Sequence, residues 1–260
     1  MKPLLLDKAA RPNSIDPFVQ DWVAATNGRL YLSAVNNLER YPIPRWPGPV
    51  AAVPKSPMLD IGCGWGRWMV SAGMAGYHAS GIDLKPDAVA AANRVVQAHG
   101  LSGQAIAGNL GQLPFPDESF DLVFSYGVLQ HVPKSLVATC LSEVHRVLKP
   151  NGVCLIEFPL WPGLTNRLRR TECHSEDPAC WQARYYRWGE LQANFSRHFD
   201  EVTIKADCIF GIGIQFEDID IMPWYYKPIV ALSEGFRRMS ETLPPLVRLS
   251  DSVYVRGRKR

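Results

Sequence analysis

The stretch Met58–Val70 reads MLDIGCGWGRWMV, and it joins two apolar runs through three glycines at alternate positions. The first run predicts a short buried strand, and the second predicts a helix that begins near Arg67. Without side chains at Gly62, Gly64 and Gly66, a ligand can touch the backbone amides and the positive end of the helix dipole. The stretch therefore predicts a site for a nucleotide-like ligand.

Strands and helices alternate on both sides of this stretch. Because strands that alternate with helices of 10 to 16 residues form βαβ units, the pattern predicts a parallel sheet with helices on both faces. Ligands of such sheets bind beyond the carboxyl ends of the strands. The expected strands are 56–64, 77–84, 103–109, 119–127, 153–159, 201–210 and 251–258, and the expected helices are 66–76, 85–100 and 135–150. In the third helix, Leu136, Cys140, Val144 and Val147 form the expected buried stripe.

The remaining segments are expected to surround this domain. Residues 1–54 hold a helical segment followed by a proline-rich connector and predict a lead-in that caps residues 55–260. Residues 161–188 and 211–249 are too long and too apolar for simple turns, so they predict inserted cover segments. Their tryptophans and tyrosines could line a pocket of medium size.

Composition limits the possible partners. The chain has 260 residues, 47% of them hydrophobic, and a net charge of +3. This balance predicts a compact domain and gives no reason to expect nucleic acid. The chain has no apolar run of 18 residues, so the expectation is a cytoplasmic protein without a transmembrane segment. The cluster Cys173, His174 and Cys180 lacks the repeated spacing of a zinc site, so no metal is predicted.

Three polar residues follow expected strands beside the glycines. Asp60 could meet a cationic group, Asp83 could accept the two hydroxyls of a ribose, and Asn109 could read the edge of a base. Together they outline a nucleoside with a cationic tail. The usual nicotinamide fingerprint, G-x-G-x-x-G, differs from the G-x-G-x-G of this chain, which makes an oxidoreductase the weaker alternative.

Five motifs in order complete the pattern, namely DIGCGWG, GIDL, LPFPDESFDLVFS, GVLQHV and RVLKPNG. With them, the chain resembles the class I S-adenosylmethionine-dependent methyltransferases, in particular the small-molecule group, over about residues 58–159. The resemblance implies a Rossmann-like, mostly parallel seven-stranded sheet with an antiparallel last strand. It also implies S-adenosyl-L-methionine as the cofactor, and cover segments over the acceptor site.

The resemblance carries individual roles to matching positions. Asp83 would bind the ribose, Leu84 would lie against the adenine, Ser125 would lie beside the methionine amino group and Arg67 would approach its carboxylate. The family usually has Asp where this chain has Asn109. The full set of implied cofactor contacts is Asp60, Gly62, Cys63, Gly64, Gly66, Arg67, Asp83, Leu84, Asn109, Leu110, Ser125, Tyr126 and Gln130.

The acceptor and the methylated atom stay open. The sulfonium already activates the methyl group, so alignment is the main requirement, and a base is needed only for a hydroxyl acceptor. The weak candidates for a base are His131, Glu157, His174 and Tyr186. O-methylation of a small molecule is favoured, with a sugar or glycan hydroxyl as one option.

Several alternatives remain. They are N- or C-methylation of a natural product or lipid-linked acceptor, and a protein that binds the cofactor without turnover. The segment IDIMPWYYKPIVAL could contact a membrane or a partner, but Asp218 and Asp220 argue against deep insertion. The oligomeric state is open.

Overall fold

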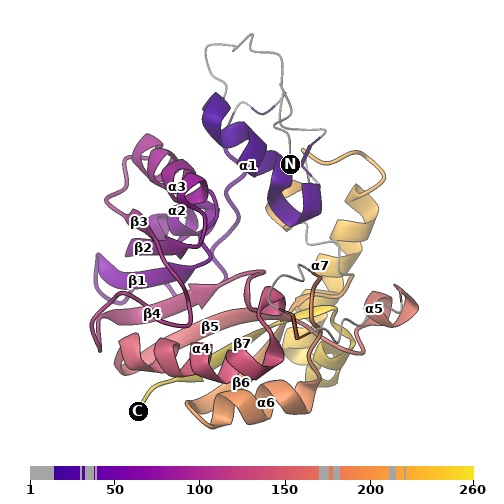
Figure 1. Cartoon of the computed structure of the whole chain (residues 1–260). Coiled ribbons are helices and arrows are strands. Elements are labelled where there is room, and N and C mark those ends of the chain that lie inside the picture. The colour runs from indigo at the N-terminus through magenta and orange to yellow at the C-terminus, as the bar shows by residue number, and fades with distance from the viewer. Residues whose placement is uncertain are drawn as a thin grey trace.

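The chain forms one seven-stranded sheet in the strand order β3-β2-β1-β4-β5-β7-β6 (Figure 1). The computed structural model describes residues 15–29, 31–32, 38, 40–169, 176–177, 182–210, 215–219 and 221–260. The strands are β1 Ser56–Ile61, β2 Tyr77–Asp83, β3 Gln104–Ala107, β4 Phe120–Ser125, β5 Leu148–Pro159, β6 Asp200–Cys208 and β7 Ser252–Arg258. Strand β7 runs antiparallel to both β5 and β6, while β1 to β5 pair in parallel. The predicted sheet with its antiparallel last strand is confirmed.

Helices cover both faces of the sheet (Figure 1). The α-helices are α1 Pro17–Arg29, α2 Arg67–Met74, α3 Pro86–Ala98, α4 Lys134–Val147, α5 Leu164–Arg169, α6 Trp188–Ser196 and α7 Lys227–Thr242. The short 3₁₀ helices are η2 Leu129–His131, η3 Phe216–Asp218 and η4 Pro244–Leu249. Side chains of α1, α2, α3 and α7 share one core cluster, and side chains of α4, α6 and η4 share the other. We call these two sides the α2 face and the α4 face.

The third expected helix is shorter than predicted, and its buried stripe is shifted. Helix α4 ends at Val147, and Leu148 already pairs with Phe120 of β4. The amide of Ser119 donates to the carbonyl of Val147, so the sheet captures the backbone that the sequence pattern would leave helical. The buried positions are Val137, Cys140, Leu141, Val144 and Val147. Leu136 is therefore not part of the stripe, because its side chain is exposed.

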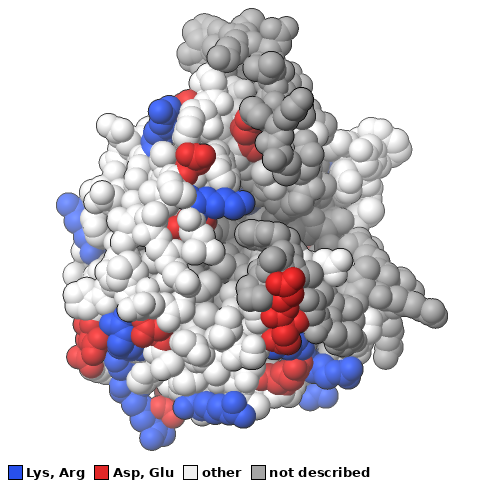
Figure 2. Space-filling view, viewed as in Figure 1, with Lys and Arg blue, Asp and Glu red and all other residues white. Residues whose placement is uncertain are grey.

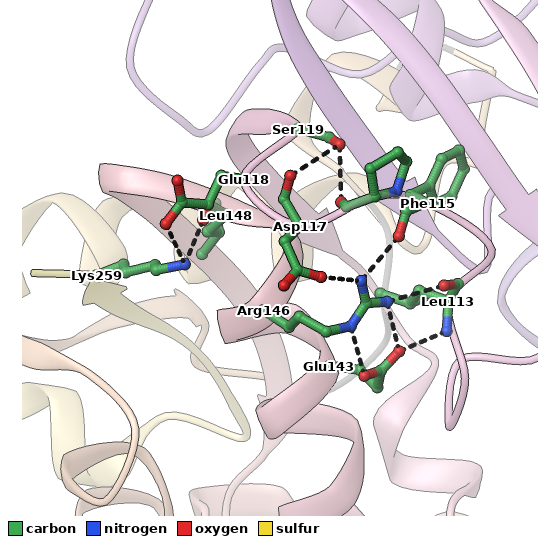
Figure 3. A network of polar contacts seen from close by, with 10 residues as sticks. Leu113, Phe115, Asp117, Glu118, Ser119, Glu143, Arg146, Leu148 and Lys259 are labelled. Carbon is green, nitrogen blue, oxygen red and sulfur yellow. Dashed lines mark hydrogen bonds and ion pairs between the residues drawn. The ribbon is translucent and has the colours of Figure 1, made fainter.

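Arg146 explains why two of the sequence motifs occur together. From α4 its guanidinium donates to the carbonyl of Leu113 at 2.9 Å and to that of Phe115 at 2.8 Å (Figure 3). It also pairs with Asp117 and with Glu143, both at 2.8 Å. The arginine of RVLKPNG thus holds the loop LPFPDES in place. This network is structural and fixes the chain that follows β3.

Candidate functional site

The glycine-rich turn lies at the carboxyl end of β1 and has a backbone that few other residues adopt. Gly62, Gly64 and Gly66 have φ angles of 71°, 51° and 85°. A Cβ on Gly62 would approach Val128 to 2.2 Å, whereas one on Gly64 would meet nothing within 4 Å. The backbone of Gly64 therefore borders open space. A ligand can approach the backbone directly there.

Asp83, at the end of β2, holds this turn to the neighbouring strand. One carboxylate oxygen accepts the amide of Gly64 at 3.0 Å, and the other accepts the amide of Lys85, also at 3.0 Å. Each oxygen keeps a further lone pair for a hydroxyl donor. The adjacent Leu84 is 63% exposed, which leaves an apolar surface beside the carboxylate. An acid next to an apolar surface suits a ribose joined to a flat base.

Asp60 is the buried acid of the turn. Its side chain is 1% exposed, and its Oδ2 atom has no hydrogen-bond partner. Burial, together with the nearby carboxylate of Asp83, raises the pKa of Asp60 well above its usual value. A cationic ligand group would relieve this penalty, because an opposite charge favours the ionised form. The orphaned oxygen and the open glycine backbone fit a nucleoside with a cationic tail.

The other predicted cofactor contacts differ in their exposure to solvent. Asn109 is exposed, and its Oδ1 accepts the amide of Gly111 at 2.9 Å, while Leu110 packs against the core of the α4 face. Ser125 is buried and donates to the carbonyl of Ile61 at 3.0 Å. The thiol of Cys63 is buried against Gly81 of β2, and it also donates to the carbonyl of Gly64 at 4.0 Å.

The side chain of Arg67 is buried and does not face open space. Its predicted role, an approach to the methionine carboxylate, requires open space. Its Nη2 atom lies 3.3 Å from Oδ2 of Asp218, and both side chains are buried. The hydroxyl of Tyr31 also donates to Asp218, and burial raises the pKa of Tyr31, so this hydroxyl keeps its proton. One nitrogen of the guanidinium pairs with Asp218 of η3, whereas Nε has no hydrogen-bond partner. Arg67 thus links the lead-in to the cover segment, and its approach to the methionine carboxylate stays a prediction.

A second acid cluster lies further along the carboxyl edge, on the α2 face. Glu157 of β5 accepts the amide of Gly127, which follows β4, at 3.0 Å. Asp207 of β6 accepts the hydroxyls of Ser252 at 2.6 Å and Tyr126 at 3.2 Å. Burial and the charge of Asp207 raise the pKa of Glu157 to about 8, and burial also raises the pKa of Asp207. The two carboxyl groups are close enough for the charge of one to affect the protonation of the other.

The cluster lies close to the glycine-rich turn. Gly127 binds Glu157, and the next residue, Val128, packs against Gly62. The amide of Gln215, from the cover segment, donates to the hydroxyl of Tyr126 at 2.8 Å. One loop thus joins the expected cofactor side to the acid cluster, beneath the cover.

The raised pKa of Glu157 makes a prediction for stability. The folded chain holds the proton up to about pH 8, whereas the unfolded chain releases it near pH 4.5. The contribution of this group to the free energy of unfolding therefore decreases from pH 4.5 to about 8 and then levels off. We expect Glu157→Gln to raise the free energy of unfolding by about 1 kcal/mol or more at pH 8.5 relative to its effect at pH 5. Urea unfolding at both pH values checks this, and an equal effect at both would contradict it.

The remaining candidate bases are less well placed. Tyr186 is 1% exposed on the α4 face, where its ring packs edge-on against Phe158, and burial raises its pKa further. His131 is the last residue of η2, and its carbonyl accepts a hydrogen bond from Arg184 at 2.9 Å. The side-chain amide of Gln130 donates to the carbonyl of Gly127 at 3.3 Å. His174 lies outside the described residues. Glu157 lies at the carboxyl edge of the sheet, and its pKa is raised to about 8.

The structure also brings in residues that sequence reasoning missed, namely Tyr31, Asp207 and Asp218. Asp207 shares a face with Lys205 at the edge of the sheet, so its position in the pattern predicts exposure. In the fold it is buried, with Tyr126 and Ser252 as its hydrogen-bond donors. Asp218 had a usable signal, because it is an acid within an apolar and aromatic stretch, but its partner Arg67 is 151 residues away.

A cavity, a metal site or a membrane span would be other kinds of functional feature in the described residues. A cavity of about 340 Å³ lies at the opposite edge of the sheet, near Lys55, Tyr77 and Leu101, where β2 begins. Within the described ranges, no group of three or more His, Cys, Asp or Glu residues could hold a metal ion. Cys173 and Cys180 fall outside those ranges. No described helix is long and apolar enough to cross a membrane.

Surface charge is mixed on the side of the molecule shown in Figure 2. Acidic and basic side chains lie interspersed along the lower rim of this face. Ion pairs of the described surface include Lys149 with Asp121 at 3.0 Å and Arg260 with Asp200 at 2.6 Å. Such exposed pairs contribute little to stability.

Comparison with known proteins identifies the domain. Residues 59–156 match the family model described as a methyltransferase domain. A demethylmenaquinone methyltransferase of Geobacillus kaustophilus is 39% identical over 104 residues, which are 37% of this chain and 43% of that protein. A sterol 24-C-methyltransferase of Gibberella zeae is 35% identical over 179 residues, which are 65% of this chain and 44% of that protein. The chain thus spans less than half the length of these curated relatives.

Solved structures support the fold. A SAM-dependent methyltransferase of Thermotoga maritima, described as a possible histamine N-methyltransferase, is 18% identical with a TM-score of 0.53 and covers 93% of this chain and 92% of its own. A SAM-dependent methyltransferase of Methanosarcina mazei is 24% identical with a TM-score of 0.50, over 59% of this chain and 85% of its own. At these identities the likeness concerns the fold alone.

Sheet order, glycine-rich turn and matched model together define a Rossmann-like methyltransferase domain. Residues 59–156 match the methyltransferase family model, and the fold around them is that of the class I S-adenosylmethionine-dependent methyltransferases.

Proposed function

We propose that this protein transfers a methyl group from S-adenosylmethionine to a small-molecule acceptor. The observation that carries the proposal is the buried, unpartnered Oδ2 of Asp60 beside the open backbone of Gly64. A cationic amino-acid group fits the first, and the open space beside Gly64 leaves room for the rest of that amino acid. When bound, the cofactor supplies a methyl group that its sulfonium already makes electrophilic.

The chain's own residues would hold and orient this cofactor. The glycine turn and Asp60 would hold the methionine part, and Asp83 would accept the ribose hydroxyls. The exposed side chain of Leu84 would cover one side of the base. Helix α1 approaches the same place, because the ring of Trp22 lies 5.7 Å from the ammonium of Lys85. Residues 1–54 would thus act as a cap, and water exclusion with alignment would provide most of the rate enhancement.

Within this function, we favour a hydroxyl acceptor, and a sugar or glycan hydroxyl is one candidate. Glu157 lies at the carboxyl edge of the sheet, and its pKa of about 8 is close to the pH at which a general base is most useful. As its ionised carboxylate, it would take the proton that the hydroxyl loses on methyl transfer. The relatives' named acceptors are demethylmenaquinone and a sterol, so C-methylation is the main competing outcome.

The cofactor assignment makes a direct prediction. We expect Asp83→Ala to weaken binding of S-adenosylhomocysteine at least tenfold, because it removes the ribose acceptor and releases the amide of Gly64. Calorimetry measures the affinity, and circular dichroism checks the fold. Asp87→Ala is the matched control, since this exposed acid lies in the first turn of α3, and its affinity should stay within about twofold. Unchanged affinity of Asp83→Ala would remove Asp83 from the site.

The acceptor is best found with labelled cofactor. We would screen transfer of the labelled methyl group to sugars, nucleotide-sugars, phenols and amines. Transfer to hydroxyl compounds supports the proposal, and transfer to amines or carbon atoms alone contradicts O-methylation. Binding of NADH in place of S-adenosylhomocysteine would overturn the cofactor assignment. Binding of S-adenosylhomocysteine without transfer to any compound would favour a non-catalytic module.

A further inference from the structure

Large apolar side chains gather on the outside of α7 and of the turn before it. Seven of the fifteen large apolar side chains that are exposed in the described part of the chain lie within residues 224–249, about a tenth of the sequence. Six of them form what we call the apolar stripe, namely Trp224, Tyr225, Ile229, Leu232, Met239 and Leu243. Trp224 is 79% exposed. A concentration of this kind marks an interaction site more often than a chance exposure.

The spacing of the stripe places its members on one side of the helix. From Tyr225 to Leu243 they follow one another at intervals of three, four and seven residues, as one face of an α-helix requires. The inner side of α7 carries smaller residues, because Val230, Ser233 and Ser240 are its buried positions. The hydroxyl of Ser233 accepts the amide of Ile209 at 3.2 Å. Helix α7 thus turns Val230, Ser233 and Ser240 inward and holds Phe236 half-buried against Phe210, while the large apolar side chains of the stripe stay exposed.

The charges around the stripe favour an anionic partner. Residues 221–249 hold four basic and two acidic side chains, Glu234 and Glu241. Both acids are paired within the helix, since Arg237 lies 2.6 Å from Glu234 and 2.9 Å from Glu241. The surface that flanks the stripe therefore has a net positive charge.

Asp218, whose charge is unfavourable for membrane contact, is turned away from the stripe. Asp218 is 2% exposed and forms its ion pair with Arg67 inside the protein. Its charge therefore does not lie among the exposed side chains of α7. Asp220 lies outside the described residues.

We propose that the apolar stripe docks α7 onto the surface of a bilayer that contains anionic lipids. Trp224 and Tyr225, at one end of the stripe, have an apolar ring body with a polar edge, which suits the interface between headgroups and acyl chains. The aliphatic side chains behind them would lie at the boundary of the acyl region, as in helices that rest in the interface plane. The basic residues beside them would meet the anionic headgroups.

A second copy of the chain fits the stripe less well. Helix α7 has 16 residues and is about 24 Å long at 1.5 Å per residue. It provides about two heptads, and a coiled-coil seam is usually sustained over three or four. A lipid surface needs no such length, because each side chain inserts independently.

The residues beside the stripe pack into the same core as the residues of the proposed acceptor side. Met222 and Tyr226 flank the two exposed rings and pack into the core of the α2 face, which also holds Trp68 and Tyr126. Tyr126 contacts Asp207 of the acid cluster. Docking would bring this edge of the domain to the lipid surface. The docking itself does not depend on methyl transfer, so the two proposals can fail separately.

Vesicle flotation tests the docking. The full chain is mixed with vesicles of about three parts phosphatidylcholine to one part phosphatidylglycerol, and with vesicles of phosphatidylcholine alone. We expect it to float with the anionic vesicles, and the double variant Leu232→Glu, Met239→Glu to lower the partition coefficient at least tenfold. The matched control is Leu136→Glu, an exposed leucine of similar exposure on α4, which should stay within about twofold of the unchanged chain.

The outcomes separate the possible occupants. Absence of flotation, or equal flotation of the double variant, would overturn the proposal. A dimer in light scattering that the double variant dissociates, without vesicle binding, would identify a second copy as the occupant. Thermal melting verifies the fold of each variant, and Trp224→Ala, Tyr225→Ala replaces the double variant if that one does not fold. If the unchanged chain floats but does not bind S-adenosylhomocysteine, the proposed function fails and the docking stands.

Discussion

Asp218→Ala is expected to destabilise the protein by about 3–5 kcal/mol, the cost of leaving a buried charge without its partner. The substitution removes the acceptor of both Arg67 and Tyr31, and the guanidinium of Arg67 is 3.3 Å from Asp218 with little access to water. Urea unfolding measures the loss. It should also free the cover segment from the lead-in, because this cluster joins the two.

Two further variants test the origin of that loss. Asp121→Ala removes the partner of Lys149 in an exposed pair and should cost less than about 1 kcal/mol. The double variant Arg67→Met, Asp218→Leu should recover much of the stability, because apolar residues of similar size can replace a buried ion pair. A loss below about 1 kcal/mol for Asp218→Ala would show that the pair is not buried in solution.

Glu157→Gln is expected to lower kcat for a hydroxyl acceptor by about 10²–10⁴, the usual contribution of a general base. The affinity for S-adenosylhomocysteine should stay within about twofold, because Glu157 contacts Gly127 and not the glycine-rich turn. Since a base acts as its ionised form, kcat of the unchanged enzyme should rise with pH and level off above the pKa of about 8. Steady-state kinetics across pH with the acceptor found in the screen checks both points.

Asp207→Asn distinguishes a base from a structural role for Glu157. This substitution removes the neighbouring charge that raises the pKa of Glu157, so the midpoint of the pH profile should move down by about one unit. Glu118→Gln, an exposed acid at the start of the β4 region, is the matched control and should leave the profile unchanged. Full activity of Glu157→Gln, or an unmoved midpoint in Asp207→Asn, would exclude Glu157 as the base.

Local sequence was sufficient for the sheet and for the turn at its centre. Strand and helix periods are properties of neighbouring residues. The positive φ angles at positions 62, 64 and 66 are a local property too, because glycine adopts such angles readily. The end of α4 was less predictable. Its last residues continue a helical pattern, yet the sheet gains hydrogen bonds by pairing Leu148 with Phe120. Competition between two such structures depends on a partner strand that lies far away in the sequence.

The candidate site divides in the same way. Asp60, Asp83 and the glycines could be named from the sequence, since each ends a strand and parallel strands bring their carboxyl ends together. The burial and the partners of each charged side chain could not be predicted from the sequence. Arg67 has the position of a cofactor contact, but one nitrogen of its guanidinium pairs with Asp218. The sequence of α7 predicts an ordinary amphipathic helix. Only the contacts of α7 in the fold show which of its sides is buried.

The sequence by itself thus determined the class of the protein, its parallel sheet and the end of that sheet where the cofactor is expected. These features follow from the order of residues along single strands and turns. Only the tertiary structure decided that Glu157 and Asp207 share one buried place, that Asp218 lies inside and that the stripe lies outside. The physical reason is that burial sets the pKa of a carboxyl group and the exposure of an apolar face. Burial at those positions depends on which distant segments fold over them.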